Sequence, residues 1–453
     1  MLNRHILSTL NEWKKSPLKK PLVLRGARQV GKTVAVRMFA NSYSHFTELN
    51  MELPENIEFF KRKLTPEEII QAIKLRHGIP TDADSWLLFL DEIQSCPEAV
   101  AMLRYFHEKL PALHVVAAGS LLEIALQREH ISFPVGRVEF RYMYPMNFEE
   151  FIGATSSPEM QETFRQVPSP AFATEELFAL YHRYALVGGM PEAVAGYAVT
   201  RDIVAVNRIY ENLFTAYVDD IPKYAKNQTM TRILRHCLQT APFQAGKRIR
   251  FTGFGESGYG SRETGEALRT LEQVMLISLL YPTTAFQLPF IPDLKKSPRL
   301  QWIDTGLLHY ITGIQQNLIG IDDLSNDFRG GLLEQLTGQE LLAAHNDKRN
   351  PPQFWVRQKT QSQAEIDFML SLNGVPLPVE VKSGATGKLR SLHLYMENCP
   401  DAHLAIRLYR GPHLIQEAGI NSKYQLANIP YYHASKIPEY AQHLNVPQAR
   451  NAE

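Results

Sequence analysis

A glycine-rich segment near the start of the sequence constrains the fold more than any other feature. It has the spacing G-x4-G-K-[ST] and lies between a short apolar run, residues 22–24, and a helix-compatible run, residues 34–40. Strand, glycine-rich turn and helix in this order are typical of a phosphate-binding loop, because backbone amides and a helix N-terminus then face a polyphosphate. The residues predicted to bind the nucleotide are Gly26, Ala27, Arg28, Gln29, Val30, Gly31, Lys32, Thr33 and Val34.

Side chains at the end of this loop have expected roles in the chemistry. Lys32 can reach the β- and γ-phosphates of a nucleoside triphosphate, where its charge is stabilising. The hydroxyl of Thr33 can be a ligand of Mg²⁺. The sequence therefore predicts ATP and magnesium as cofactors and Lys32 as a catalytic residue.

An apolar run that ends in two acids, residues 85–93, agrees with this prediction. Such a run is expected of a strand buried on both faces of a parallel sheet. Asp91 is predicted to bind the magnesium shell, and Glu92 to polarise the attacking water. P-loop enzymes with such a glutamate insert a further strand between the P-loop strand and the aspartate strand, and residues 114–120 are the candidate.

Ser120, at the end of that candidate strand, is placed for contact with the nucleotide. It can be a polar sensor near the γ-phosphate. It can equally be the N-cap of the helix expected after it. Both alternatives stay open, and Ser120 is kept among the predicted nucleotide-binding residues.

The composition is that of a globular protein with two to four domains. Hydrophobic residues make up 44% of the 453 residues and charged residues 21%. The three cysteines are far apart and form no C-x-x-C, which favours a reducing cytoplasm and argues against a structural zinc site. The N-terminal residues predict an amphipathic helix, and neither a signal peptide nor a membrane span is expected. Segment 155–175, rich in Ser and Pro, is predicted to be a loop or linker.

A basic segment lies in the middle of the chain and is hidden by the net charge of +1. Residues 221–300 contain 12 Lys or Arg against five Asp or Glu, so this segment carries +7 and the remainder −6. The elements predicted here are a helix at 229–240, a basic strand at 247–251, a helix at 261–274, and a hairpin joining 275–282 to 300–303.

That order of elements is the order of a winged helix, with 261–274 as recognition helix and 283–299 as wing. Basic charge on such a fold is the footprint expected of contact with double-stranded DNA. Many ATPases use a winged helix only as a lid or an oligomer contact, and this alternative stays open. The glycine-rich segment 253–260 is looser than a tight helix-turn-helix, which argues against sequence-specific reading.

Near the C-terminus, residues 363–370 and 376–383 each predict a strand, with a turn at Asn373 and Gly374 between them. Alternation along the second strand places Glu380 and Lys382 on one face.

Asp367 can meet this pair from the first strand, and Glu334 lies upstream on an expected helix. Nucleases of the PD-(D/E)xK type use an Asp and a Glu to share a divalent metal, with a lysine beside the water. The candidate nuclease residues are therefore Glu334, Asp367, Glu380 and Lys382. The alternative is a solvated ladder of ion pairs on a strand face.

Short motifs along the chain carry a family resemblance: residues 26–33, 90–94, 119–122, 134–137, 144–151, 188–191, 304–307, 331–334, 365–368 and 380–383. By these motifs the chain resembles bacterial and archaeal ATPases that join an AAA-type P-loop domain to a C-terminal domain of unknown function. The resemblance covers nearly the whole chain. It implies kinship with the AAA+ and STAND ATPases, a winged helix, and a C-terminal fold similar to restriction endonucleases.

The resemblance also points to Arg137, which follows a glycine just before the last expected core strand. Related ATPases hold an arginine there that faces the γ-phosphate of a neighbouring chain or of their own nucleotide. An arginine suits this role because its charge is permanent and its fork binds two phosphate oxygens. A surface salt bridge is the alternative for Arg137. For residues 188–191 a lid beside the adenine and a helix-ending turn both stay open.

The predicted fold class is α/β: a P-loop ATPase domain with a parallel sheet, a helical and winged-helix middle, and a restriction-endonuclease-like C-terminal domain. The expected function is a cytoplasmic, Mg-dependent ATPase that acts on DNA and can form homo-oligomers. The alternative is an ATP-dependent switch whose other domains bind partners or DNA without cutting. The predicted domains are 1–155 (P-loop ATPase), 156–225 (helical lid or linker), 226–303 (winged-helix-like) and 304–453 (nuclease-like).

Overall fold

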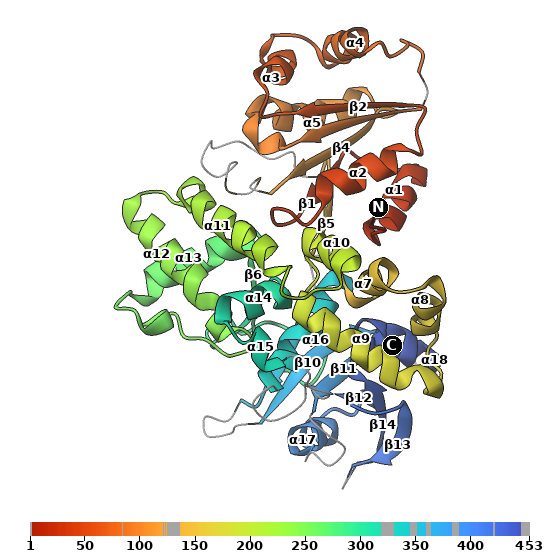
Figure 1. The fold of residues 1–453 in the computed structure, drawn as a ribbon, viewed down its shortest axis with the longest axis vertical. Coiled ribbons are helices and arrows are strands. Elements are labelled where there is room, and N and C mark those ends of the chain that lie inside the picture. The colour runs from red at the N-terminus through yellow and green to blue at the C-terminus, as the bar shows by residue number, and fades with distance from the viewer. Residues whose placement is uncertain are drawn as a thin grey trace. The chain divides into compact units, whose positions relative to one another are not determined.

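The computed structural model describes most of the chain. The described residues are 2–83, 85–120, 122, 124, 136–318, 330–344, 351–358, 364–382, 389–419 and 422–444. They form two compact units (Figure 1). The first is mainly Met1–Tyr144, and the second comprises Pro145–Glu272, Ile277–His345 and Arg349–Glu453. The first unit also includes Gln273–Leu276, and the second unit contains residues of all four predicted domains.

The first unit is built on a five-stranded sheet in the order β2-β3-β4-β1-β5. All its neighbouring strands run parallel. Since β4 lies between β1 and β3, the predicted insertion of a strand at 114–120 is confirmed. The strands are β1 (Leu22–Arg25), β2 (His45–Asn50), β3 (Trp86–Asp91), β4 (His114–Gly119) and β5 (Glu139–Tyr142).

The side chains of this sheet are largely apolar, so the sheet is buried at the centre of the unit. Every residue of β3 is buried, as expected of a strand covered on both faces. On one face, Leu88 and Val115 pack in a cluster with Leu103 and Phe106 of α5. The helices of this unit are α1 (Ile6–Lys15), α2 (Lys32–Ala40), α3 (Pro54–Lys61), α4 (Pro66–His77), η1 (Ile93–Ser95) and α5 (Pro97–Lys109).

The second unit begins with helices, and one of them corrects the sequence prediction for 155–175. Residues Pro158–Arg165 form helix α8, with Pro158 in its first turn. The hydroxyl of Ser157 accepts a hydrogen bond from the Met160 amide (3.3 Å) and so caps the helix. Ser-Pro marks a helix start here, because proline fits the first turn and serine the N-cap. The other helices of this part are α7 (Phe148–Thr155), η2 (Ala171–Ala173), α9 (Thr174–Val187), α10 (Pro191–Thr200) and α11 (Asn207–Tyr224).

The basic middle segment has the predicted order of elements. Helix α12 (Gln228–Thr240), which packs beside α11 (Figure 1), is followed by η3 (Ala241–Gln244), η4 (Phe254–Glu256) and α13 (Ser261–Gln273). Strands β6 (Ile277–Leu280) and β8 (Arg299–Trp302) then form an antiparallel pair. The predicted basic strand at 247–251 contributes only one bridge, between Arg248 and Arg299.

The predicted wing at 283–299 differs from the structure at its beginning. Strand β7 (Pro282–Thr283) pairs with β9 (Gln353–Val356) and so becomes an edge strand of the C-terminal sheet. The predicted domain boundary at 303–304 is therefore crossed by a sheet. Backbone pairing across this boundary needs no sequence signal beyond an extended segment, which is why the prediction missed it.

The C-terminal sheet has seven strands in the order β13-β14-β12-β11-β10-β9-β7. Helix α17 packs on one face, where Leu392 and Tyr395 meet Trp355, Ile366 and Leu426. The remaining elements are α14 (Thr305–Thr312), α15 (Gln315–Leu318), α16 (Gly330–Ala344), β10 (Glu365–Leu372), β11 (Val375–Val381), α17 (Arg390–Asn398), β12 (Leu404–Tyr409), β13 (Leu414–Ala418), β14 (Tyr424–Pro430), η6 (Tyr431–Lys436) and α18 (Ile437–His443).

Polar side chains of α16 connect the parts of the second unit. Gln335 accepts a hydrogen bond from the Trp302 amide (2.9 Å), and Gln339 accepts one from the Thr305 amide (3.0 Å). Glu340 accepts one from the Phe148 amide (3.0 Å) at the start of α7. These buried bonds satisfy helix and strand ends that would otherwise be unpaired, which explains why the middle and C-terminal regions form one unit. None of the described helices is long and apolar enough to cross a membrane.

Candidate functional site

The P-loop connects β1 to α2 at the carboxyl end of the first sheet. Gly31 precedes α2 with a left-handed backbone (φ 94°), which favours glycine. Gly26 is needed for a different reason: a Cβ there would lie 2.4 Å from the carbonyl oxygen of Met143. The loop thus begins against the carboxyl end of β5 and ends at a helix N-terminus, the geometry expected of a phosphate site.

The Lys32 ammonium is folded into this loop. It donates hydrogen bonds to the carbonyl oxygens of Gly26 (3.0 Å) and Ala27 (2.8 Å), and the residue is 7% exposed. Burial lowers the pKa of Lys32 to about 8, although Glu92 and Asp91 act in the opposite direction. Its hydrogen-bond partners are neutral carbonyl oxygens, which suits a cation that must donate to phosphate oxygens instead when a nucleotide binds.

Thr33, in the first turn of α2, lies beside Asp91, the last residue of β3. The Thr33 hydroxyl donates a hydrogen bond to Asp91 Oδ2 (2.8 Å), and Asp91 is buried at the carboxyl end of its strand. Burial raises the pKa of Asp91, which the hydrogen bond from Thr33 partly offsets. A hydroxyl and a carboxylate oxygen at this separation are the ligand types that Mg²⁺ prefers. The residues present therefore fit a magnesium ion with its nucleotide.

Glu92 has a strained backbone that orients its side chain. Its φ of 49° and ψ of 43° lie in the left-handed region, which is rare for residues other than glycine. Gln94 donates a hydrogen bond to the Glu92 carboxylate (2.5 Å). Sequence reasoning assigned no role to Gln94, and its place two residues after Glu92 was the only signal. We infer that Gln94 holds the carboxylate in position.

Ser120 follows β4, next to the strand that carries Asp91. The residue is 8% exposed, and its hydroxyl has no hydrogen-bond partner among the described residues. An unsatisfied buried hydroxyl is unusual and is expected to find a partner when a ligand binds. The helix predicted after Ser120 lies largely outside the described residues, so both roles of Ser120 stay predictions.

Arg137 lies at the opposite edge of the sheet from the P-loop. Glu139 begins β5 and pairs with Leu22 at the start of β1, whereas the P-loop follows Arg25 at the end of that strand. Arg137 forms an exposed ion pair with Glu108 (2.8 Å). A contact with the nucleotide of its own chain would have to span about the length of a strand, and it stays a prediction. A contact with a neighbouring chain stays a prediction.

Arg4 is a site-supporting residue that the sequence did not indicate. Its guanidinium donates hydrogen bonds to the carbonyl oxygens of Val30 (2.7 Å) and Tyr144 (2.7 Å), and it is 8% exposed. Val30 is part of the P-loop, and Tyr144 follows β5. Arg4 thus fixes the loop to the edge strand. A single basic residue before an amphipathic helix carries no signal for this role.

The second candidate site is set by the hairpin of β10 and β11. Leu372 pairs with Val375 across the turn at Asn373 and Gly374, and both turn residues have positive φ. This two-residue turn confirms the predicted hairpin and fixes its register. The same register brings Asp367 opposite Glu380, so the two side chains share a face.

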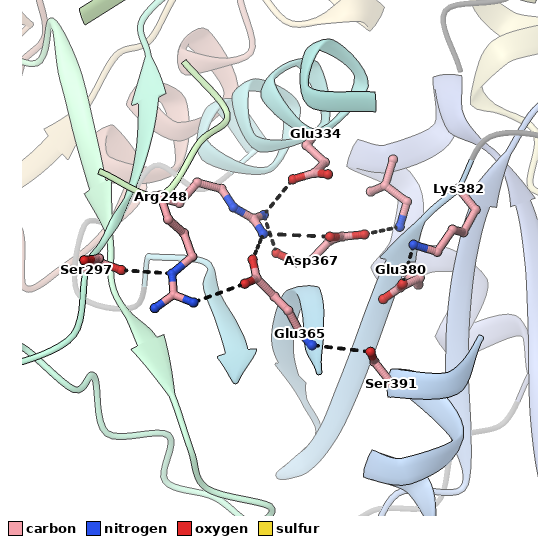
Figure 2. Close-up of polar contacts among 10 residues, drawn as sticks. Arg248, Ser297, Glu334, Glu365, Asp367, Glu380, Lys382 and Ser391 are labelled. Atoms are coloured by element: carbon pink, nitrogen blue, oxygen red, sulfur yellow. Dashed lines mark hydrogen bonds and ion pairs between the residues drawn. The ribbon is translucent and has the colours of Figure 1, made fainter. Parts of the chain in front are cut away.

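Glu380 forms a short ion pair with Lys382 (2.7 Å), as Figure 2 shows. The predicted sharing of one strand face by these two residues is therefore confirmed. Asp367 Oδ2 accepts a hydrogen bond from the Val381 amide (2.8 Å). Burial raises the pKa of Glu380, and Asp367 raises it further while Lys382 opposes this shift. The second carboxylate oxygen of Glu380 is buried without a hydrogen-bond partner.

A buried arginine from the middle region completes this cluster, and no sequence motif indicates it. Arg299 of β8 forms ion pairs with Glu334 (3.4 Å), Glu365 (2.5 Å) and Asp367 (3.8 Å). Glu365 also contacts Arg248 at 3.5 Å (Figure 2). In the described part of the chain, no group of three or more His, Cys, Asp or Glu side chains is placed to hold a metal ion. The four predicted nuclease residues thus gather at one place, with an arginine among them.

Residues 188–191 form a helix-ending turn. Gly188 ends α9 with φ 73°, and the Gly189 amide donates a hydrogen bond to Asp304 (2.6 Å). Pro191 then starts α10. A Cβ on Gly188 would lie 2.4 Å from Asp304, so glycine is required for this contact. The turn alternative is therefore the one that the structure supports, within the second unit.

Comparison with known proteins identifies the first region. Residues 18–152 match the family model described as an AAA domain, so this region is similar to the AAA domains of P-loop ATPases. Residues 178–318 and 329–432 match two models that are each described as a domain of unknown function, DUF8612 and DUF4143.

Similar proteins add little beyond this class. Uncharacterized proteins of Mycobacterium tuberculosis and Mycobacterium bovis are each 35% identical over 122 residues, which is 26% of this chain. The match spans only 25% of the length of these relatives. A Walker-type ATPase of Pyrococcus abyssi is similar with a TM-score of 0.45 and 15% identity, over 69% of this chain and 96% of that chain. The ORC1 protein of Aeropyrum pernix, solved with DNA, has a TM-score of 0.29 and 11% identity, over 68% and 90% of the two chains.

Proposed function

We propose that the chain binds ATP with Mg²⁺ and hydrolyses it. The observation that carries the proposal is the Thr33–Asp91 hydrogen bond of 2.8 Å. Beside it lies the buried Lys32, whose hydrogen-bond partners are neutral carbonyl oxygens. Both acids of the Asp91–Glu92 pair lie at the carboxyl end of β3, where a P-loop ATPase needs them. A bound magnesium ion supplies charge neutralisation between the β- and γ-phosphates.

The residues have distinct roles in this proposal. The amides of the P-loop and Lys32 bind the phosphates, and Thr33 and Asp91 are the residues that would hold the magnesium ion. Glu92, held by Gln94, orients the attacking water and accepts its proton. The unpartnered Ser120 hydroxyl is a donor for the γ-phosphate. Arg137 acts on the nucleotide of a second copy in a homo-oligomer.

Paired variants of the P-loop and of the acid test this function. Lys32→Ala is expected to abolish ATP binding, whereas Glu92→Gln keeps binding and stops hydrolysis. Lys20→Ala is the matched control, because this half-buried lysine donates to the Gly136 carbonyl oxygen (2.9 Å), away from the loop. Binding is measured with a fluorescent ATP analogue, and hydrolysis by phosphate release. Turnover like that of the wild type in Glu92→Gln would refute the assigned base.

A second candidate function is metal-dependent cleavage of DNA at the carboxylate site. The shared face of Asp367, Glu380 and Lys382 supports it. The competing proposal is a switch whose middle and C-terminal regions bind partners without cutting. Incubation of plasmid and linear DNA with Mg²⁺ or Mn²⁺, with and without ATP, separates the two. Cleavage that Asp367→Ala abolishes supports the nuclease, and intact DNA under all conditions supports the switch.

Contact with duplex DNA is the remaining part of the proposal, with a winged helix as its site. Exposed basic residues lie both on the predicted recognition helix and before it. Helix α13 carries two exposed arginines but three glutamates, while Lys247, Arg248 and Arg250 are exposed before it. Affinity for duplex DNA should fall with salt at a log-log slope of about −0.9 per neutralised phosphate. Changing Lys247, Arg248 and Arg250 to Glu should flatten this slope. No binding at low salt would leave the winged helix as a lid or oligomer contact.

A further inference from the structure

The carboxylate site of the second unit already contains a cation that the chain itself provides. The Arg299 guanidinium is buried, at 3% exposure, and it contacts Glu334, Glu365 and Asp367. It also donates a hydrogen bond to the Asp367 carbonyl oxygen (2.8 Å). A buried guanidinium needs such partners, because its desolvation is costly.

Aromatic rings hold the same guanidinium from other directions. It lies 4.8 Å from the ring centre of Phe354 and 5.6 Å from that of Phe368. Contacts of this kind stabilise a cation within about 6 Å of a ring. The position of Arg299 is therefore fixed by carboxylates, a carbonyl oxygen and two ring faces, and not by one flexible ion pair.

The strand that carries Arg299 is fastened to the helix that carries Glu334. Trp302 of β8 forms two hydrogen bonds with the side chain of Gln335 on α16, at 2.9 and 2.8 Å. Arg299 thus comes from the middle region, while the acids that it contacts come from α16 and β10. The occupation of the carboxylate site by this guanidinium depends on the docking of β8.

One acid of the site is left without a full set of partners. Glu380 is 3% exposed, and Lys382 binds only one of its oxygens, while the other is buried and has no hydrogen-bond partner among the residues that the structure describes. An orphaned carboxylate oxygen in a buried acidic site indicates a missing donor or cation. Arg299 forms its ion pairs with Glu334, Glu365 and Asp367 and thus occupies the cluster on the side of Asp367.

We propose that Arg299 is an autoinhibitory counter-ion. While it lies among Glu334, Glu365 and Asp367, the acids that the structure describes here are not placed to hold a metal ion. Once it leaves, Glu334, Asp367 and Glu380 become the ligands of a divalent cation. Two positive charges at one group of carboxylates repel each other strongly in a buried site. A divalent ion therefore binds well only when the guanidinium leaves. This inference deepens the second candidate function, because the same acids are the proposed nuclease ligands.

Binding of Mn²⁺ tests the proposal without any activity assay. Electron paramagnetic resonance of free Mn²⁺ measures the dissociation constant of full-length protein without nucleotide. All proteins carry Asp91→Asn, which removes the carboxylate predicted to bind metal in the first unit. Arg299→Gln should bind Mn²⁺ at least about tenfold more tightly than its parent, since a competing buried charge is removed.

Matched variants show where the ion binds. Arg248→Gln removes an exposed arginine that shares Glu365 with Arg299, and it should leave the dissociation constant unchanged. Adding Glu380→Gln to Arg299→Gln should remove the gain in affinity. If the gain persists, the ion binds elsewhere and the proposal is overturned.

Another variant covers the case in which Arg299→Gln does not fold. Glu365→Gln weakens the shortest ion pair of Arg299 but leaves all three proposed metal ligands in place. A gain of about threefold or more supports the proposal, and no gain in either folded variant overturns it. Tight binding by the parent overturns the autoinhibition but leaves the nuclease candidate standing. No binding by any variant overturns both.

Discussion

Each of the two candidate sites contains a buried cation, but the partners of the two cations differ in charge. In the first unit, Lys32 donates hydrogen bonds to two neutral carbonyl oxygens of its own loop. In the second unit, Arg299 contacts three carboxylates. A cation with neutral partners can exchange them for phosphate oxygens at low cost, whereas a cation among carboxylates is already neutralised.

The shifts in pKa follow this difference. Burial lowers the pKa of Lys32 to about 8. The charged form of this lysine is therefore disfavoured in the folded protein until an anion binds. For Arg299 burial acts in the same direction, but Glu334, Asp367 and Glu365 outweigh it and raise the pKa of the guanidinium. The Lys32 charge of the P-loop site thus remains available for an anionic ligand, whereas the carboxylates that contact Arg299 already have a counter-ion from the same chain.

The largest expected effect concerns stability. Arg299→Met should lower the free energy of unfolding of the second unit by about 3–5 kcal/mol, because it leaves buried carboxylates without their counter-ion. Lys32→Met should change the stability of the first unit by less than about 1 kcal/mol, since it removes a desolvated charge along with its hydrogen bonds. Scanning calorimetry of both full-length variants measures this. Equal losses in the two variants would break the comparison.

The next effect is on catalysis. Asp91→Asn should reduce ATP turnover by about 100-fold or more, because the charge next to the metal position is lost. Asp367→Asn, a change of the same kind in the second unit, should leave the basal ATP turnover unchanged. Phosphate release under saturating ATP measures both. A turnover that depends on Asp367 would mean that the two sites are functionally coupled.

A smaller effect is expected on the pH dependence of ATP affinity. Only the charged form of Lys32 attracts phosphate, and its pKa in the free loop is about 8. Raising the pH from 7 to 9 deprotonates the lysine, so affinity should fall about tenfold. In Lys32→Arg the charge persists throughout this range, and the dependence should vanish. Titration of a fluorescent ATP analogue at several pH values measures it, and a flat profile in the wild type would contradict the assigned pKa.

The smallest effect is expected at Arg137. Its ion pair with Glu108 is exposed, so Arg137→Ala should change stability by less than about 1 kcal/mol. Turnover in dilute solution should equal that of the wild type, because the residue lies far from the nucleotide of its own chain. Arg104→Ala is the control, since Arg104 shares Glu108 at 3.1 Å. A loss of turnover that appears only in Arg137→Ala, and only at high protein concentration, would establish a contact between chains.

Much of the first site could be predicted because its information is local. Gly26, Lys32 and Thr33 lie within one loop, and Asp91 with Glu92 ends one buried strand. A parallel sheet brings the carboxyl ends of such strands together, so the Thr33–Asp91 contact follows from the element order alone. The hairpin spacing likewise predicts that Asp367 faces Glu380, because a two-residue turn permits one register.

Other contacts could not be predicted, because they join residues far apart in sequence whose types are common. Arg4 contacts Val30 and Tyr144 through backbone carbonyl oxygens, which every residue possesses. The register of β5, which puts Arg137 near the amino ends of β1 and β5, is likewise set by backbone pairing and not by any motif. The segment 155–175 was misjudged for a local reason, since Ser and Pro start helices as well as loops.

The sequence by itself determined the P-loop, the acid pair, the strand order implied by them and the hairpin of the C-terminal acids. Each of these rests on short-range spacing, which the backbone converts into one geometry. Only the tertiary structure decided that Arg299 of β8 lies among Glu334, Glu365 and Asp367. Burial selects such a partner: charged groups taken out of water must neutralise each other, and which groups meet depends on how whole elements pack.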